Sequence, residues 1–302
     1  MSRVMRRCLV ALVLFFAAPA GAQDVDFEQV RIETLPLADG LHMLVGQGGN
    51  MVVSTGSDGP ALVDDQFAPL APKIEAAVRV LQDRPVRFVI NTHWHGDHTG
   101  GNEPFGKGGA LIVAHENVRR RMSTPQFIAA FQREVPPAPA GALPVVTFDD
   151  GVTLHWNGEE IAVEHVDPAH TDGDALVWFR KAGVVHTGDT YVSGAFPFVD
   201  VSSGGSLAGI LSSAEHVLKE AGPATKIVPG HGALSNVAEL SAWREMLVVV
   251  RDRVNTALAA GKSLEAYQAE RPLADLEDRY ARGFLTAERF LAIIWSDLSR
   301  AK

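Results

Sequence analysis

Short runs of apolar, often β-branched residues recur along the first half of the chain and indicate buried strands. These runs occupy residues 40–46, 50–56, 60–65, 86–91 and 109–115. Between them, the spacing of apolar positions predicts a helix from about 69 to 82, and residues 115–133 are also predicted to be helical. The Pro- and Ala-rich segment 135–144 then breaks the pattern. We interpret it as a connector, with a flap over a cleft as the alternative.

The strand pattern resumes after this connector. Residues 152–166 are typical of a hairpin with a tight turn at Asn157–Gly158. Further strands are predicted at 175–179, 184–189 and 226–232, and a helix is predicted near 206–221. Two successive sets of strands, each with flanking helices, predict an α+β fold in which two packed sheets carry helices on their outer faces.

The C-terminal part of the chain shows a helical pattern instead. Its apolar residues recur at steps of three and four: Leu240, Trp243, Leu247, Val250, Val254 and Leu258. We predict that residues 236–302 form a helical extension packed on the domain formed by residues 23–235. The apolar stripe could instead be a dimer seam, so the oligomeric state stays open.

The N-terminus has the pattern of a cleavable secretory signal peptide. Basic residues in "MSRVMRR" precede a short apolar run and a small-residue site at Ala20–Gly21–Ala22. The run is short for a membrane span, which takes about 20 apolar residues, so an uncleaved anchor is the weaker alternative. We therefore predict a signal peptide at residues 1–22, a periplasmic or secreted location, and no stable membrane association after cleavage. Its removal takes away Cys8, the only cysteine, so disulfides are excluded from the mature fold.

The charge of the chain argues against nucleic acid as a partner. The formal net charge is −9, and loss of the three arginines of the signal peptide makes it more negative still. Such a surface repels polyphosphate. A hydrophobic content of 46% is ordinary for a globular protein. The partner that we predict is a small-molecule substrate.

The segment "NTHWHGDHTGG", residues 91–101, concentrates chemistry after a predicted strand. His93 and His95 alternate, so they lie on one side of extended chain. Gly96 allows a sharp turn that brings Asp97 and His98 back towards the same point. Imidazoles and a carboxylate that converge in this way are ligands for a borderline cation such as zinc.

More donors stand at strand ends far along the chain. His170 lies in the polar loop "DPAHTDGD", Asp189 ends the strand "VVHTGD", and His231 ends "KIVPGHG". A residue at a strand end is held by a rigid frame and can point into a shared cleft. These three residues are therefore candidates to complete a metal centre.

Together the motif His-x-His-x-Asp-His, the lone His, Thr-Gly-Asp and the terminal Gly-His resemble the metallo-β-lactamase superfamily, over residues from about 40 to 235. The resemblance implies a four-layer αββα sandwich with a dinuclear metal cleft at one edge. Position by position, it assigns His93, His95 and His170 to one zinc ion, Asp97, His98 and His231 to a second, and Asp189 to a bridge between them. Asp64 matches an acidic position whose side chain orients a metal-ligating histidine without binding the metal itself.

This resemblance also implies an activity. A secreted hydrolase with two Zn²⁺ per chain would use a metal-bridging hydroxide to attack a carbonyl in a β-lactam, thioester, lactone or ester. Asp97 would act as the catalytic residue that hydrogen-bonds the nucleophile. His95 favours zinc, because di-iron relatives carry a carboxylate there. The aspartate at position 189 is similar to the residue found there in thioesterases and lactonases. The classical β-lactamases often have cysteine or serine at that position. The alternative is a non-catalytic or accessory metalloprotein of the cell envelope.

The other conspicuous side chains are interpreted as structural. His42, His155 and His165 are expected to pack or face solvent, His115 to start a helix, His216 to lie on a helix face, and His186 and Trp94 to be buried structural residues.

Overall fold

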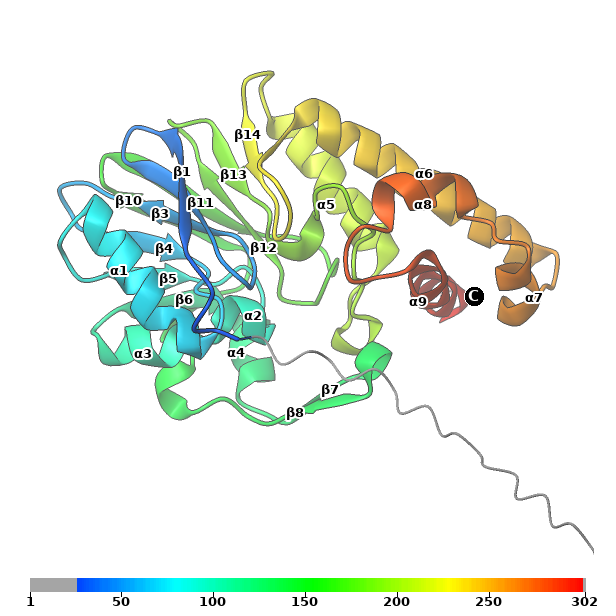
Figure 1. The fold of residues 1–302 in the computed structure, drawn as a ribbon, viewed down its shortest axis with the longest axis horizontal. Coiled ribbons are helices and arrows are strands. Elements are labelled where there is room, and N and C mark those ends of the chain that lie inside the picture. The colour runs from blue at the N-terminus through cyan, green and yellow to red at the C-terminus, as the bar shows by residue number, and fades with distance from the viewer. Residues whose placement is uncertain (1–25, 301–302) are drawn as a thin grey trace, which may run out of the picture.

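Two β-sheets pack face to face and carry helices on their outer sides (Figure 1), in a computed structural model that describes residues 26–300. The predicted α+β class and layer order are confirmed. The predicted signal peptide lies outside the described residues. Within those residues, none of the helices has the length and hydrophobicity to cross a membrane.

The first sheet has seven strands in the order β1-β2-β3-β4-β5-β6-β9. Its strands are β1 (Glu33–Ala38), β2 (Leu41–Val45), β3 (Met51–Ser54), β4 (Ala61–Val63), β5 (Phe88–Ile90), β6 (Leu111–His115) and β9 (Val146–Phe148). Strands β4, β5, β6 and β9 run parallel to one another. Their carboxyl ends therefore meet at one edge of the sheet.

The second sheet has six strands in the order β10-β11-β12-β13-β14-β15. Its strands are β10 (Gly151–Trp156), β11 (Glu159–His165), β12 (Ala175–Phe179), β13 (Val184–His186), β14 (Lys226–Val228) and β15 (Ser235–Asn236). Trp156 pairs with Glu159 across the predicted Asn157–Gly158 turn. Both turn residues have positive φ, 53° and 74°, the conformation that favours Asn-Gly in a two-residue hairpin loop.

Helices cover both outer faces. Beside the first sheet lie α1 (Ala71–Leu81), α2 (Gly96–Thr99), α3 (Asn102–Lys107) and α4 (Glu116–Met122), with the 3₁₀ turns η1 (Ala68–Leu70) and η3 (Ala140–Ala142). On the side of the second sheet lie α5 (Leu207–Glu220), α6 (Val237–Ala259), α7 (Leu264–Ala269), α8 (Ala274–Tyr280) and α9 (Ala287–Arg300), with η4 (Gly188–Thr190) and η5 (Val201–Ser203) near the strand ends.

The buried apolar residues fall into layers that follow this arrangement. Val163 and Val177, paired on neighbouring strands, belong to the core between the sheets. Trp243 and Leu247 of α6 belong to a separate core between the second sheet and its helices. The indole N–H of Trp243 also donates to the carbonyl of Ala195 at 2.8 Å, so α6 is fixed to the loop after β13.

The helix predicted at 115–133 is too long. Helix α4 ends at Met122 and is followed by a hairpin of β7 (Gln126–Ile128) and β8 (Arg133–Val135), with η2 (Ala129–Phe131) between them. Pro125 explains the early end, because proline disfavours helical backbone at the residue before it. The predicted apolar stripe of α6 packs on the core beside the second sheet, with Leu258 partly buried at its end.

Candidate metal centre

The predicted donors gather at the edge where strands of both sheets end. His93 and His95 follow β5, and α2 turns the chain so that His98 faces back towards them. Asp189 lies in η4 directly after β13, and His231 follows β14. His170 comes from the loop between β11 and β12. Each sheet therefore supplies part of one site.

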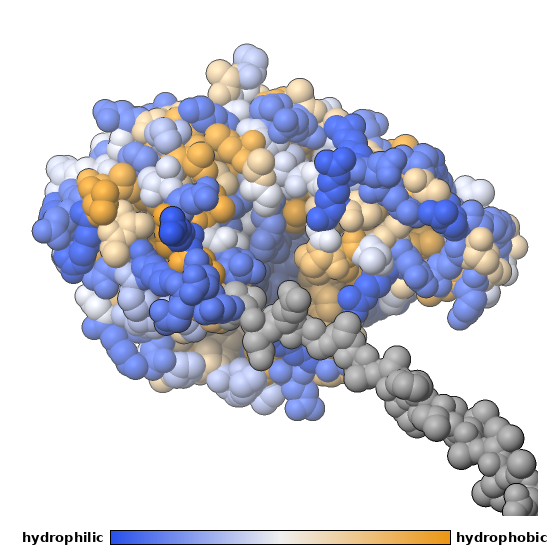
Figure 2. Space-filling view, viewed as in Figure 1, coloured by the Kyte–Doolittle hydropathy of each residue, from blue (hydrophilic) through white to orange (hydrophobic). Residues whose placement is uncertain are grey.

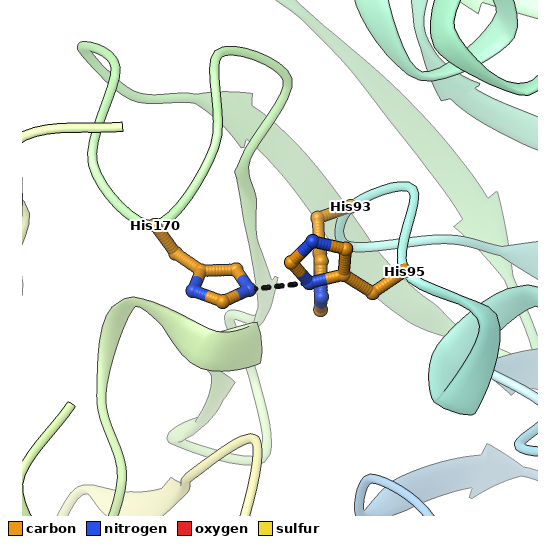
Figure 3. Close-up of side chains that lie close together, drawn as sticks. All are labelled: His93, His95 and His170. Carbon is orange, nitrogen blue, oxygen red and sulfur yellow. Dashed lines mark hydrogen bonds between the residues drawn. The ribbon is translucent and has the colours of Figure 1, made fainter. Parts of the chain in front are cut away.

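His93, His95 and His170 form the first group of donors, and their rings converge in Figure 3. One donor atom from each residue lies within 4.8 Å of the others. The closest approach is 2.8 Å, between His170 Nε2 and His95 Nδ1. The three side chains are almost fully buried.

Asp97, His98 and His231 form the second group. The Oδ2 atom of Asp97 is 3.2 Å from His231 Nε2 and 3.7 Å from His98 Nε2. The two imidazole Nε2 atoms are 3.3 Å apart. The side chains of Asp97 and His231 each keep 30% of their surface exposed, so the site opens to solvent on this side.

Asp189 stands between the two groups. Its Oδ1 atom is 3.2 Å from His98 Nε2, and its Oδ2 atom is 3.4 Å from His231 Nε2 and 3.6 Å from His170 Nε2. The structure thus brings all seven predicted donors together, with Asp189 in contact with both groups.

Two glycines permit this crowding. A Cβ atom built on Gly49 would lie 2.1 Å from Cε1 of His98, and one on Gly230 would lie 2.0 Å from Oδ1 of Asp189. Any side chain at either position would displace a donor.

Hydrogen bonds outside the site fix how the imidazoles are oriented. His98 Nδ1 donates to Asp64 Oδ2 at 2.7 Å, as predicted for Asp64. His95 Nε2 donates to Asp200 Oδ2 at 3.1 Å, and His170 Nδ1 donates to the carbonyl of Phe198 at 2.7 Å. Such outer partners set the tautomer and leave the other ring nitrogen free to bind a metal.

Sequence reasoning did not identify Asp200 or the carbonyl of Phe198. Both lie in the loop between β13 and α5, far from the histidines along the chain. An aspartate in an irregular loop carries no local pattern that marks it as a histidine partner, so only the spatial contact reveals its role.

The donor set fits a cation such as zinc. His93 Nε2 and Asp189 Oδ1 are buried and, among the residues that the structure describes, have no hydrogen-bond partner. His95 Nδ1 and His170 Nε2 face each other while the second nitrogen of each ring donates outwards, so a shared proton or a metal ion is needed between them. Donors on a tetrahedral zinc ion lie about 3.3 Å apart, given bonds of about 2.0 Å. The separations within the site are of this size.

The electrostatics favour positive charge at the same place. Burial lowers the pKa of His93 and brings that of His170 to about 4, so both rings stay neutral, the form that binds metals. Burial also acts to lower the pKa of His98 and His231, but the neighbouring carboxylates, Asp189 foremost, outweigh it. The net pKa of both histidines is raised, to about 10 for His231.

The side chains interpreted as structural are placed accordingly. His186 is buried in β13, where Nε2 donates to the carbonyl of Asn50 at 2.9 Å. His115 ends β6 and caps α4 by accepting from the N–H of Asn117. Its ring stacks on that of His165, with centroids 3.8 Å apart. Trp94 is buried in an apolar cluster, as expected.

The fold and the gathered donors define a class: two-sheet sandwich proteins with a histidine- and aspartate-rich site at one edge that is suited to metal ions. The family model described as "Metallo-beta-lactamase superfamily" matches residues 42–231, which is more than half of the chain, and the chain belongs to this superfamily.

Solved structures show the same fold. A metallo-beta-lactamase from Pontibacter korlensis matches with a TM-score of 0.58 and 18% identity, over 72% of this chain and 99% of that one. The DIM-1 metallo-beta-lactamase matches with a TM-score of 0.57 and 17% identity, over 72% of this chain and 98% of that one. At these identities the likeness concerns the fold.

Proposed function

We propose that the chain is an exported hydrolase that holds two zinc ions and cleaves a carbonyl compound, namely a β-lactam, thioester, lactone or ester. The observation that carries the proposal is the arrangement of seven donors in two groups that share Asp189. Superfamily membership supports it. The ligand set has imidazole in the majority, which suits zinc, and His95 stands where iron-binding relatives are expected to carry a carboxylate.

Two zinc ions in these groups would polarise a carbonyl oxygen and lower the pKa of water towards neutrality. Asp97 is the residue placed to handle the nucleophile's proton. Its carboxylate lies on the open side of the site, next to His231, and the surrounding imidazoles hold its pKa below the ordinary value despite burial. It therefore stays ionised and can accept a hydrogen bond from an attacking water.

The neighbourhood of Asp189 bears on the substrate. The segment after it, "TYVSGAFPF", contains no cation that could bind the carboxylate of a β-lactam. This composition favours a thioester, lactone or ester, while β-lactams remain within the proposed class.

A panel assay tests the proposal. Zinc-loaded protein is incubated with nitrocefin, S-lactoylglutathione and γ-butyrolactone, with and without a chelator, and its zinc content is measured. We expect about two zinc ions per chain and chelator-sensitive turnover of at least one compound. Bound zinc without turnover of any compound would favour the accessory metalloprotein instead.

Export has its own test. We propose cleavage after Ala22, so the N-terminus of the mature protein should begin at Gln23. Sequencing the N-terminus after expression in a bacterium, with fractionation of the periplasm, gives the answer. A chain that stays in the cytoplasm with an intact N-terminus would contradict it.

A further inference from the structure

Three phenylalanine rings extend outwards from the metal donors. The ring of Phe198 lies 6.0 Å from that of His95 and 5.6 Å from that of His170, measured between centroids. Phe131 is 4.9 Å and Phe284 is 6.3 Å from Phe198, and these two are 6.0 Å from each other. We call Phe131, Phe198 and Phe284 the aromatic wall. It gives continuous apolar contact from the metal centre towards the surface.

The wall is built from three separate segments that hold one another. Phe131 comes from η2, Phe198 from the loop after β13, and Phe284 from the loop between α8 and α9. The N–H of Phe196 donates to the carbonyl of Tyr280 at 2.9 Å, which ties the second segment to the third. The neighbouring Leu285 is buried and anchors the third segment, yet Phe284 keeps 59% of its surface exposed.

Phe284 extends the apolar surface of Phe131, which lies 6.0 Å away between ring centroids. A contiguous apolar patch, unlike a single exposed residue, is a mark of ligand binding. In the space-filling view, hydrophobic surface borders a hollow between the sandwich and the C-terminal helices (Figure 2). Beyond Phe131, a cavity of about 380 Å³ continues between η2, η5 and α9, lined mainly by apolar side chains that include Leu285 and Ile293. Asp200 also lines this cavity, with its carboxylate oxygens bonded to His95, Ser202 and Ser203 and not to Arg289.

A positive charge stands at the far side of this surface. Arg289 of α9 lines the cavity, and its guanidinium carbon lies 6.0 Å above the centroid of the Phe131 ring. Within the described residues, Arg289 is exposed and forms no ion pair, as is also true of Arg279, Arg282 and Arg300, whereas Arg244, Arg251 and Arg253 each pair with a carboxylate. What distinguishes Arg289 is its position over the Phe131 ring at the edge of the cavity. On a strongly acidic protein, an arginine without a carboxylate partner is suited to an anionic ligand.

We propose that the aromatic wall and Arg289 form the substrate subsite, which takes an aryl or other bulky apolar group that carries a carboxylate. This inference rests on the proposed function, since it places the reacting carbonyl at the metal centre and the rest of the same molecule on the wall. Phe284 and Phe131 contact the apolar group, and Arg289 pairs with the acid. Substrates without these two features lose contacts, and therefore bind more weakly.

Binding of a compound without a scissile bond tests the subsite separately from catalysis. The zinc-loaded protein is titrated with 4-phenylbutanoate and with the uncharged 4-phenylbutanamide, and dissociation constants are measured by ligand-detected NMR. We expect Phe284→Ala to weaken both compounds about tenfold, since one aromatic contact is lost. Arg289→Gln should weaken the acid about fivefold and the amide less than about twofold, as for a solvent-accessible ion pair.

Matched control variants are available in the β7–β8 hairpin, which also carries Phe131. Phe127 is 47% exposed but lies outside the wall, and Arg133 is exposed and does not line the cavity. Phe127→Ala and Arg133→Gln should leave both dissociation constants unchanged. The subsite proposal is wrong if Phe284→Ala leaves both dissociation constants unchanged, as Phe127→Ala should. It is also wrong if the acid still binds Arg289→Gln more tightly than the amide does by the same factor as in the wild type. The second result would mean that the carboxylate binds the metal ions.

Kinetics separate this inference from the proposed function. For a compound of the panel that is turned over, extension with a phenyl group and a carboxylate should lower KM, and Phe284→Ala should raise KM with little change in kcat. Turnover that is insensitive to Phe284 would overturn the subsite and leave the hydrolase intact. If the protein turns over no compound but Phe284→Ala loses binding, the subsite proposal stands and the hydrolase proposal is overturned.

Discussion

Asp64→Asn is expected to weaken one metal site and spare the other. The carboxylate of Asp64 is buried and accepts three hydrogen bonds: from Thr92 N–H at 2.8 Å, Thr92 Oγ1 at 2.8 Å and His98 Nδ1 at 2.7 Å. An amide offers one acceptor oxygen and an NH₂ group that only donates. If its oxygen faces Thr92 N–H, the NH₂ group faces His98 Nδ1. That imidazole must then carry its proton on Nε2, the atom that faces Asp97 and Asp189.

The opposite orientation of the amide is worse. It sets NH₂ against the Thr92 N–H and leaves a buried donor without a partner, at a cost of about 1–3 kcal/mol. The backbone adds little to the effect, because Asp64 has φ of 57° and Asn tolerates this left-handed conformation. Substitution of such outer partners reduces metal affinity by about 10–100-fold. We expect a loss of this size for the Asp97–His98–His231 group, and less than a threefold loss for the other group.

Competitive titration with a chromophoric zinc chelator measures the two affinities. Asp65→Asn is the matched control, because Asp65 is equally buried, follows Asp64 directly and accepts from the N–H of Gly101 without contacting an imidazole. Its zinc affinities should stay within about threefold of the wild type, well below the loss expected for an outer partner. Wild-type affinity for both ions in Asp64→Asn, or an equal loss in Asp65→Asn, would refute the reasoning.

Three further outcomes are expected. Asp189→Ala removes the carboxylate shared by both groups, so metal content and hydrolysis should fall together, and a variant that keeps two ions and full activity would disprove the bridge. Chelation should lower Tm by about 10–20 °C if free zinc is about a hundredfold above both dissociation constants, since each of the two ions then adds about 2.7 kcal/mol of stability; calorimetry that finds no shift would argue against tight binding. Burial and then the stacked His165 lower the pKa of His115 below its ordinary value of 6.5, so the unfolded chain gains a proton before the folded one does. The stability that neutral His115 contributes is therefore present above pH 6.5 and is lost as the pH falls below it. His115→Gln should reduce this acid-induced loss in urea unfolding, and an unchanged pH dependence would count against the assignment.

The sequence predicted those features that depend on local pattern. Alternation and spacing indicated the strands, and Asn157–Gly158 located a hairpin because few residue pairs adopt two positive φ angles. The donors stood out because unusual residue types followed strand ends. Asp64 was recognised through the family resemblance, and the structure shows its bond to His98.

Features that depend on distant contacts were beyond this reasoning. The hairpin at 126–135 consists of short strands that pair only with each other, so its periodicity was too brief to distinguish from helix. Asp200 meets His95 only because the loop after β13 folds over the site. Phe131 and Phe284 are far apart in sequence and form one surface only in the folded chain.

The division of the donors between two sheets has a consequence for assembly. His93, His95, Asp97 and His98 are carried by the amino-terminal sheet, while His170, Asp189 and His231 are carried by its partner. A half-formed molecule with one sheet in place would offer only part of the donor set, so metal ions would bind fully only after the two layers dock. Bound metal ions would link the two sheets and slow their separation.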